Sequence, residues 1–189
     1  MDFVVGLPTT QKGHNRVWVI IDRLTKIAHF LPFNTRWSVA KLAKYYVREI
    51  VRLHGVLASI VSDRDARFTS RFWQSFQEAM GTELQMSSAY HPQMDGQSER
   101  TIQILEDMLR ACCMDWGRSW EQYLSLAEFA YNNSFQANIG MSPFEALYGR
   151  PCRSPLCWEE PGDRAVMSSE LIQECNEKVP LIRQRLLTA

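Results

Sequence analysis

The sequence has few of the features that mark membrane, secreted or zinc-binding proteins. None of its apolar runs approaches the roughly 20 residues that a membrane-spanning helix needs. Asp2 follows Met1 directly, where a secretory signal would place a basic and then an apolar stretch. The five cysteines are an odd number and form no CxxC pair, so neither a disulfide framework nor a zinc site is expected. We predict a reduced, intracellular protein without membrane contact.

The chain also has no net charge, because the charges of 21 basic and 21 acidic residues cancel. Nucleic-acid-binding proteins are usually basic, so this total argues against that class. The uneven distribution of charge keeps the class open. Residues 1–56 hold nine basic and three acidic residues and carry +6, and residues 57–189 carry −6. The composition of 46% hydrophobic and 22% charged residues predicts a folded globular chain.

The hydrophobic patterns predict a mixed α/β fold. Short apolar or β-branched runs predict five strands, at 2–5, 17–21, 27–33, 58–62 and 83–87. Apolar residues at helical spacing predict helices over 38–54 and 70–80, from 98 to about 116, over 119–133, and after Ser142-Pro143. We expect these elements to form a mixed five-stranded sheet flanked by helices. Trp73, Trp116 and Trp120 are expected to pack in the core or an interface.

Residues 1–150 are predicted to form this domain. Residues 151–166 are rich in proline and charge and are predicted to be a linker, so that 151–189 is a linker followed by the start of a helix. Both ends of the chain stop within predicted elements. We therefore expect the chain to be a piece of a longer polypeptide.

Three acidic residues stand at the ends of predicted elements or on the first strand. Asp63 follows an apolar strand, Glu99 lies in the first turn of a helix, and Asp2 lies on the first strand. Carboxylates are the ligands that Mg²⁺ prefers, and two such ions about 4 Å apart can hold both reacting oxygens of a phosphoryl transfer. Position alone leaves alternatives open. Asp65 competes with Asp63, Asp22 competes with Asp2, and each acid can simply be solvated.

Several motifs, specific in combination, extend over nearly the whole chain. They are Met1-Asp2-Phe3 with Gly6-Leu7-Pro8; Ile21-Asp22-Arg23-Leu24-Thr25-Lys26; Val61-Ser62-Asp63-Arg64-Asp65 with Phe68; Ser88-Ala89-Tyr90-His91-Pro92-Gln93 with Gly96-Gln97 and Glu99-Arg100; Ala130-Tyr131-Asn132-Asn133; and Ser142-Pro143-Phe144-Glu145-Ala146-Leu147-Tyr148-Gly149. With these motifs the sequence resembles the catalytic core of gypsy-type LTR retrotransposon integrases, those of plant elements above all.

The resemblance implies a ribonuclease H-like fold and a catalytic triad of Asp, Asp and Glu. Residues 64–98, thirty-five in number, separate Asp63 from Glu99, which matches the separation of the family's last two acids. The resemblance therefore assigns Asp2, Asp63 and Glu99 as catalytic and metal-binding residues for two Mg²⁺ or Mn²⁺ ions. The implied activity is 3′-end processing and strand transfer of retroelement DNA into target DNA, weak for this isolated fragment. Asp22 and Asp65 stay outside the metal site.

The family also implies partners. These are the DNA of the element ends and of the target, and further copies of the chain, in the nucleus. An N-terminal zinc-binding domain and a C-terminal DNA-binding domain of the same polyprotein would lie outside this chain.

The resemblance and the loop position give five candidate DNA-binding residues, which are His91, Gln93, Gln97, Arg100 and Gln103. His91 can contact DNA or fix its loop, and Arg100 can bind a phosphate or be solvated. Some retroviral relatives carry lysines on this helix, where the present chain has Gln103 and Glu106.

A further basic group, consisting of Lys41, Lys44, Arg48 and Arg52, lies on the polar face of the first predicted helix. A solvated face is the default interpretation, and a DNA-binding or partner surface is the alternative. Two other functions stay open for the chain as a whole. One is a DNA transposase or nuclease of the same fold, and the other is a catalytically silent module that keeps only an interaction surface.

Overall fold

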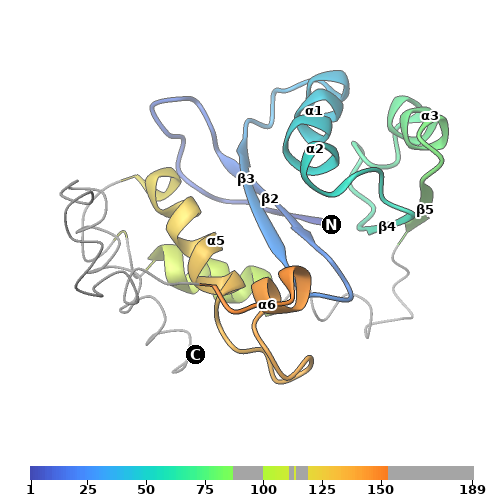
Figure 1. Ribbon diagram of the computed structural model, residues 1–189. Coiled ribbons are helices and arrows are strands. Elements are labelled where there is room, and N and C mark those ends of the chain that lie inside the picture. The colour runs from blue at the N-terminus through green and yellow to red at the C-terminus, as the bar shows by residue number, and fades with distance from the viewer. Residues whose placement is uncertain (87–99, 111–112, 114–118, 153–189) are drawn as a thin grey trace, which may run out of the picture. The chain divides into compact units, whose positions relative to one another are not determined.

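Figure 1 shows the computed structural model, which describes residues 1–86, 100–110, 113 and 119–152. Two compact units make up the chain, one of residues 1–19 and 32–100 and the other of residues 20–31 and 101–189. The predicted linker and last helix lie almost wholly outside the described residues. Among the helices described, none is long and apolar enough to cross a membrane.

The five strands are present where the sequence predicts them. β1 (Asp2–Val4), β2 (Arg16–Ile21) and β3 (Ala28–Phe33) form one sheet in that order, and β1 runs antiparallel to β2 with Asp2 opposite Val19. β4 (Ser59–Ser62) and β5 (Glu83–Met86) pair in parallel. The apolar run of β2 is buried, as its composition predicts.

The described strands form two sheets, where the sequence predicts one sheet of five strands. β1 has only three residues, and it lies beside β4 through a hydrogen bond of 2.6 Å from the amine of Met1 to the carbonyl oxygen of Val61. A pairing this short does not make a continuous ladder between the two sheets.

The first predicted helix consists of three consecutive segments, α1 (Val39–Tyr46), a π-helical turn η1 (Val47–Val51) and α2 (Arg52–His54). Ser38 caps its start, because the Ser38 hydroxyl accepts the N–H of Lys41 at 3.3 Å. The π turn was not predicted, since one wider turn leaves the apolar pattern nearly unchanged.

α3 (Arg71–Ala79) is also capped by a serine and lies against α1 (Figure 1). The hydroxyl of Ser70 accepts the N–H of Trp73 at 3.3 Å. Trp73 on this helix is fully buried, as expected from the sequence.

An aromatic cluster forms the core of the first unit. Its members are Phe3, Trp18, Phe33, Tyr46, Phe68 and Trp73. The ring of Phe3 stacks on Phe68 with centroids 4.7 Å apart, and Trp18 contacts Trp73 edge to face at 5.7 Å. Each such pair stabilises by about 0.5–1.5 kcal/mol beyond the burial of its surface. The cluster therefore fixes β1 against the loop that follows β4.

The second unit is built mainly from helices. They are a helix over 100–110, which begins at the boundary between the units, the 3₁₀ turn η2 (Trp120–Tyr123), α5 (Leu124–Asn132) and α6 (Pro143–Tyr148). Leu105, Leu109 and Trp120 are buried, and the sequence predicts this for Trp120. Ile102 is half-buried, and Cys112 and Trp116 lie outside the described residues. Ser142 caps α6 by accepting the N–H of Glu145 at 3.3 Å.

Side chains of α5 bind backbone groups of β3 within this unit. The amide of Asn132 accepts the N–H of Ala28 and donates to its carbonyl oxygen, both at 2.8 Å. Glu128 accepts the N–H of Phe30 at 2.8 Å and contacts the ring of His29 at 3.0 Å. These contacts occupy strand groups that could otherwise pair with another chain.

Replacing Phe68 with Ala tests the role of the aromatic cluster. The fully buried Phe68 ring stacks on Phe3, so its removal should lower the free energy of unfolding by about 3–5 kcal/mol. Phe72→Ala is the control, because the Phe72 side chain is 49% exposed and its loss should cost well under half as much. Urea denaturation at unchanged slope measures both values. Equal losses would contradict this description of the core.

Candidate functional site

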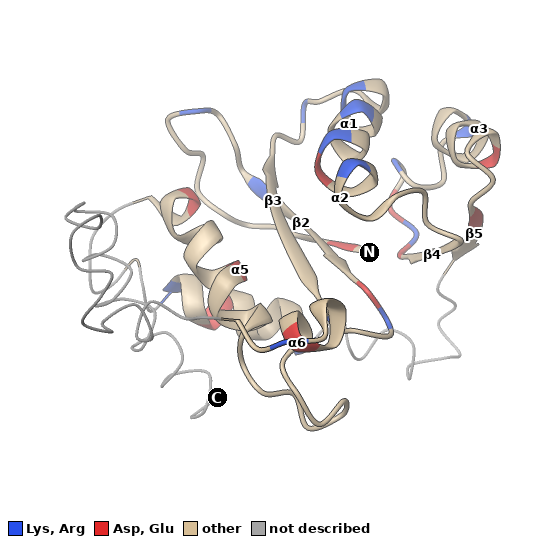
Figure 2. Ribbon diagram, in the orientation of Figure 1, with Lys and Arg blue, Asp and Glu red and all other residues tan. Residues whose placement is uncertain are grey.

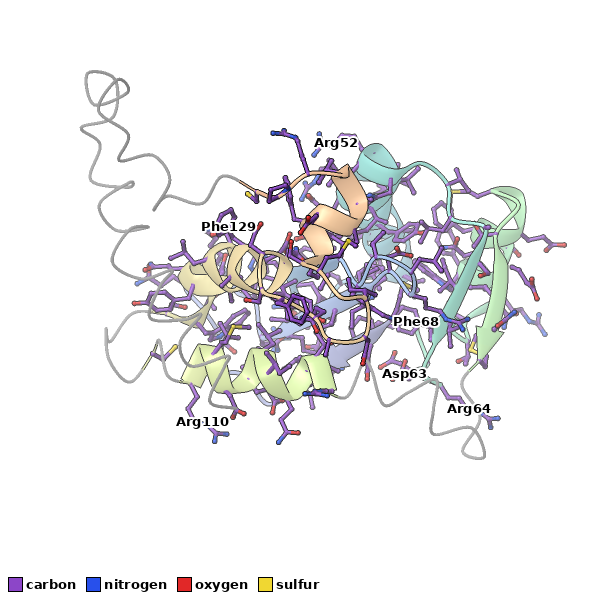
Figure 3. All side chains as sticks on the ribbon, turned by 60° about the horizontal axis from the view of Figure 1, so that its bottom comes forward. Arg52, Asp63, Arg64, Phe68, Arg110 and Phe129 are labelled. Atoms are coloured by element: carbon purple, nitrogen blue, oxygen red, sulfur yellow. The ribbon has the colours of Figure 1, made fainter. Side chains whose placement is uncertain are left out.

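The structure brings Asp2 and Asp63 into electrostatic contact. Asp2 begins β1, and its Oδ1 accepts the N–H of Phe3 at 2.6 Å. Asp63 follows the last residue of β4, and Figure 3 shows it beside Arg64 at this end of the strand. The charge of Asp2 is one of those that act on the Asp63 carboxyl. The two acids that the sequence placed sixty-one positions apart therefore share one site.

The Asp63 carboxyl lies in surroundings that disfavour its charged form. Burial raises its pKa, the N–H of Asp65 at 3.3 Å from Oδ1 opposes this shift, and the negative charges of Asp2 and Asp65 raise the pKa further. The N-terminal amine acts in the opposite direction. A cation bound between these carboxylates would relieve the repulsion.

Asp65 has a structural role instead. Its carboxylate accepts two hydrogen bonds from the guanidinium of Arg67, at 3.0 and 3.1 Å, and one from the backbone N–H of Arg67 at 2.8 Å. Arg16 lies 3.9 Å from the same carboxylate. Arg67 also donates to the carbonyl oxygen of Thr35 at 3.1 Å. This network holds the loop after Asp63 in place, and a carboxylate engaged in this way is a poor candidate for a metal ligand.

Asp22 also has a structural role, because its carboxylate binds groups within its own turn. It lies at the turn between β2 and β3, and its Oδ2 accepts the N–H of Thr25 at 2.9 Å and the hydroxyl of Thr25 at 2.6 Å. Burial acts to raise the pKa of Asp22, but the hydrogen bonds from Thr25 and its neighbours hold that pKa below its ordinary value. Asp65 and Asp22 thus both bind local groups, and the choice of Asp63 over Asp65 and of Asp2 over Asp22 stays a prediction.

The donor set of Asp2 and Asp63 fits a hard divalent cation, because both are carboxylates and their charges repel in a partly buried site. Two acids make an incomplete ligand set. The part of the chain that is described holds no group of three His, Cys, Asp or Glu side chains arranged for a metal ion. Glu99, the third acid of the predicted triad, lies outside the described residues.

The candidate DNA-binding residues are only partly described. His91, Gln93 and Gln97 lie outside the described residues. Arg100 and Gln103 are exposed on the helix over 100–110. Their exposure is compatible with DNA contact, and the role stays a prediction.

Two positioning contacts were not predicted from the sequence. The hydroxyl groups of Thr101 and Tyr131 are 3.0 Å apart in a buried hydrogen bond, which joins α5 to the start of the helix that follows Glu99. The second is the pairing of Arg67 with Asp65. Tyr131 lies in the Ala130-Tyr131-Asn132-Asn133 motif, but the motif does not indicate which distant side chain the Tyr131 hydroxyl contacts.

Asp63→Asn and Asp65→Asn form a matched pair of variants for this site. Folding raises the pKa of Asp63, so the associated stability is present below the ordinary value of 3.8 and is lost as the pH rises through the folded value. Uncharged Asn avoids this loss. Asp63→Asn should therefore melt above the wild type near pH 7, and the difference should vanish in acid.

Asp65→Asn should have the opposite effect, because it weakens the hydrogen bonds to Arg67 and costs about 1–3 kcal/mol. Thermal melts without divalent metal, from about pH 7 to pH 3, measure both effects. A melting temperature of Asp63→Asn below that of the wild type at neutral pH would contradict the description of the Asp63 site.

Comparison with known proteins finds several transposon Tf2 polyproteins among the sequence relatives of this chain. The polyprotein of transposon Tf2-3 from Schizosaccharomyces pombe is 33% identical to this chain over 157 residues, which cover 82% of this chain. They cover only 12% of the polyprotein, so the chain spans about one eighth of that relative's length. No family model matches the chain.

Solved structures share the fold at low identity. A chain of the simian T-cell lymphotropic virus intasome, in complex with PP2A regulatory subunit B56 gamma, matches with a TM-score of 0.65 and 17% identity over 89% of this chain and 59% of that one. The HTLV-2 integrase catalytic core domain, in complex with magnesium, matches with a TM-score of 0.60 and 15% identity over 77% of this chain and 93% of that one. These matches confirm the predicted ribonuclease H-like α/β fold. The chain thus has the fold of a retroviral-type integrase catalytic core and is related in sequence to a segment of the Tf2 retrotransposon polyproteins.

Proposed function

We propose that this chain is the catalytic core of a gypsy-type LTR retrotransposon integrase, which trims the 3′ ends of element DNA and joins them to target DNA. The observation that carries the proposal is the approach of Asp2 to Asp63, in a fold shared with integrase cores. The thirty-five-residue interval from Asp63 to Glu99 supports Glu99 as the third acid. The relative named above comes from a fission yeast, and the likeness to plant elements stays a prediction.

The residues supply position and charge for two successive phosphodiester reactions. In end trimming, water forms a new bond to phosphorus and the bond to the leaving nucleotide breaks. In joining, the freed 3′ hydroxyl of the element attacks a target phosphodiester in the same way. Asp2, Asp63 and Glu99 fix the reacting groups, and the Asp65–Arg67 pair holds the loop that carries Asp63.

The proposed cofactors are two Mg²⁺ or Mn²⁺ ions held by Asp2, Asp63 and Glu99. When bound, such ions activate the attacking oxygen and stabilise the leaving oxygen. The proposal is supported by the paired carboxylates of this site and by the HTLV-2 core domain, whose structure contains magnesium.

Further parts of the proposal concern organisation and partners. Residues 1–150 are the catalytic core, and 151–189 leads toward a C-terminal DNA-binding domain, while a zinc-binding domain precedes the core in the polyprotein. The chain acts in the nucleus as a homo-oligomer on element and target DNA. His91, Gln93, Gln97, Arg100 and Gln103 contact that DNA.

Asp63→Asn should lower strand transfer by at least about a hundredfold, because it removes a charge on which the reaction depends. The assay uses a labelled element-end duplex, target plasmid, and Mg²⁺ or Mn²⁺. Asp22→Asn is the matched control, since its carboxylate holds a turn, and it should retain activity within a few-fold. Mg²⁺ should also raise the melting temperature of the wild type and leave that of Asp63→Asn unchanged. Transfer that survives in Asp63→Asn would refute the assignment.

The chain alone should bind DNA weakly and integrate it poorly, because its net charge is zero and the proposed flanking domains supply further contacts. We expect dissociation constants weaker than about 1 μM near physiological salt, in the range of nonspecific binding. Fluorescence anisotropy with a labelled duplex measures this constant. Tight binding that resists salt would contradict the prediction.

A further inference from the structure

The side chain of Arg67 packs against the strand that begins with Asp2. Its guanidinium carbon lies 5.5 Å from the ring centroid of Phe3 and 5.8 Å from that of Phe33. Phe3 directly follows Asp2 and donates its N–H to the Asp2 carboxylate. Phe33 ends β3, which belongs to the same sheet as β1. The guanidinium therefore lies against a ring whose own backbone N–H holds the Asp2 carboxylate.

The same guanidinium holds the loop that begins with Asp63. It donates to both carboxylate oxygens of Asp65, and the N–H of Asp65 donates to Oδ1 of Asp63. It also donates to the carbonyl oxygen of Thr35. Figure 2 shows acidic and basic residues alternating along this loop, which follows β4. One side chain thus connects the strand that carries Asp2 with the loop that carries Asp63.

These contacts depend on the shape of the guanidinium group. Because it is planar and carries several N–H donors in a fixed fork, it can lie against an aromatic ring and bind both oxygens of a carboxylate at once. The ammonium of a lysine has neither the plane nor the fork. Lysine at position 67 would therefore keep the positive charge and lose this combination of contacts.

The charge of Arg67 has an effect opposite to that of its contacts. A positive charge near Asp2 and Asp63 repels a divalent cation, so removal of the charge alone should tighten cation binding. Removal of a contact that orients metal ligands should weaken it, because such partners typically change metal affinity by about 10–100-fold. The sign of the change in affinity therefore distinguishes the two effects.

We propose that Arg67 is a positioning residue of the metal site, which connects Asp2 and Asp63 through Phe3 and Asp65 and acts by its shape. The inference rests on the proposed function, since it takes Asp2 and Asp63 as ligands of the same ion. It adds a requirement for arginine at a position that supplies no ligand.

Binding of Mn²⁺ to the full chain tests this role without DNA and without a reaction. Electron paramagnetic resonance measures the free ion during a titration, well below the melting temperature of each variant. Arg67→Gln removes both charge and shape, and Arg67→Lys removes the shape alone. Arg64→Gln and Arg64→Lys are the matched controls, because Arg64 is exposed and directly follows Asp63 in the same loop. Circular dichroism melts check that each variant is folded.

Both Arg67 variants should bind Mn²⁺ about tenfold more weakly than the wild type. Arg64→Gln should bind it equally or up to about threefold more tightly, since this change removes only a repelling charge. Arg64→Lys should leave the affinity unchanged. If Arg67→Gln does not fold, the comparison of Arg67→Lys with Arg64→Lys decides the question.

Wild-type affinity in Arg67→Lys would overturn the inference, because the charge would then suffice. Tighter binding in Arg67→Gln would also overturn it, because Arg67 would then only repel the ion. A lower melting temperature with unchanged affinity would make Arg67 a structural residue alone.

Asp63→Asn, measured in the same titration, separates these outcomes from failure of the proposed function. Unchanged Mn²⁺ binding in Asp63→Asn would refute the shared metal site, and the role of Arg67 with it. Loss of binding in Asp63→Asn together with unchanged binding in both Arg67 variants would refute the positioning role and leave the metal site in place.

Discussion

The stack of Phe3 on Phe68 is the contact on which the candidate site depends. Asp2 precedes Phe3 directly, and Asp63 stands five positions before Phe68, so the two rings fix the backbone that carries both acids. Two carboxylates do not approach one another by attraction, because their charges repel. Burial of the aromatic cluster provides the favourable free energy that holds the two acids together in the absence of a cation.

The carboxylates that the sequence offers as metal ligands have separate tasks. Asp65 is engaged by Arg67 and shapes the loop, and Asp22 closes a turn through Thr25, whereas Asp63 has its pKa raised by burial and by neighbouring charges. Because the arginine of the Asp65 pair also binds the carbonyl oxygen of Thr35, this loop is linked to the chain that follows β3. Such a division lets one acid stay available for a cation while its neighbours provide rigidity.

Much of the fold was predictable, because local signals and tertiary packing agree. The apolar run of β2, the helix start at Ser38 and the buried Trp73 follow from period and local chemistry. The choice between Asp63 and Asp65 came only from the family resemblance. The sequence does not indicate that Arg67 binds the carboxylate of Asp65 and not that of Asp63. The π turn, the division into two sheets and the contacts of Asn132 with β3 were not predicted. They depend on small geometric differences or on pairings about a hundred residues apart.

The central claim is that Asp2 and Asp63 form a metal site on a rigid aromatic core. Anomalous diffraction from crystals of this chain soaked in Mn²⁺ tests it most directly, because the signal locates the ion without reference to activity. The account predicts an anomalous peak within bonding distance of both the Asp2 and the Asp63 carboxylates, and loss of that peak in Asp63→Asn. A peak on Asp65 or Asp22, or a peak at Asp2 that persists in Asp63→Asn, would contradict it.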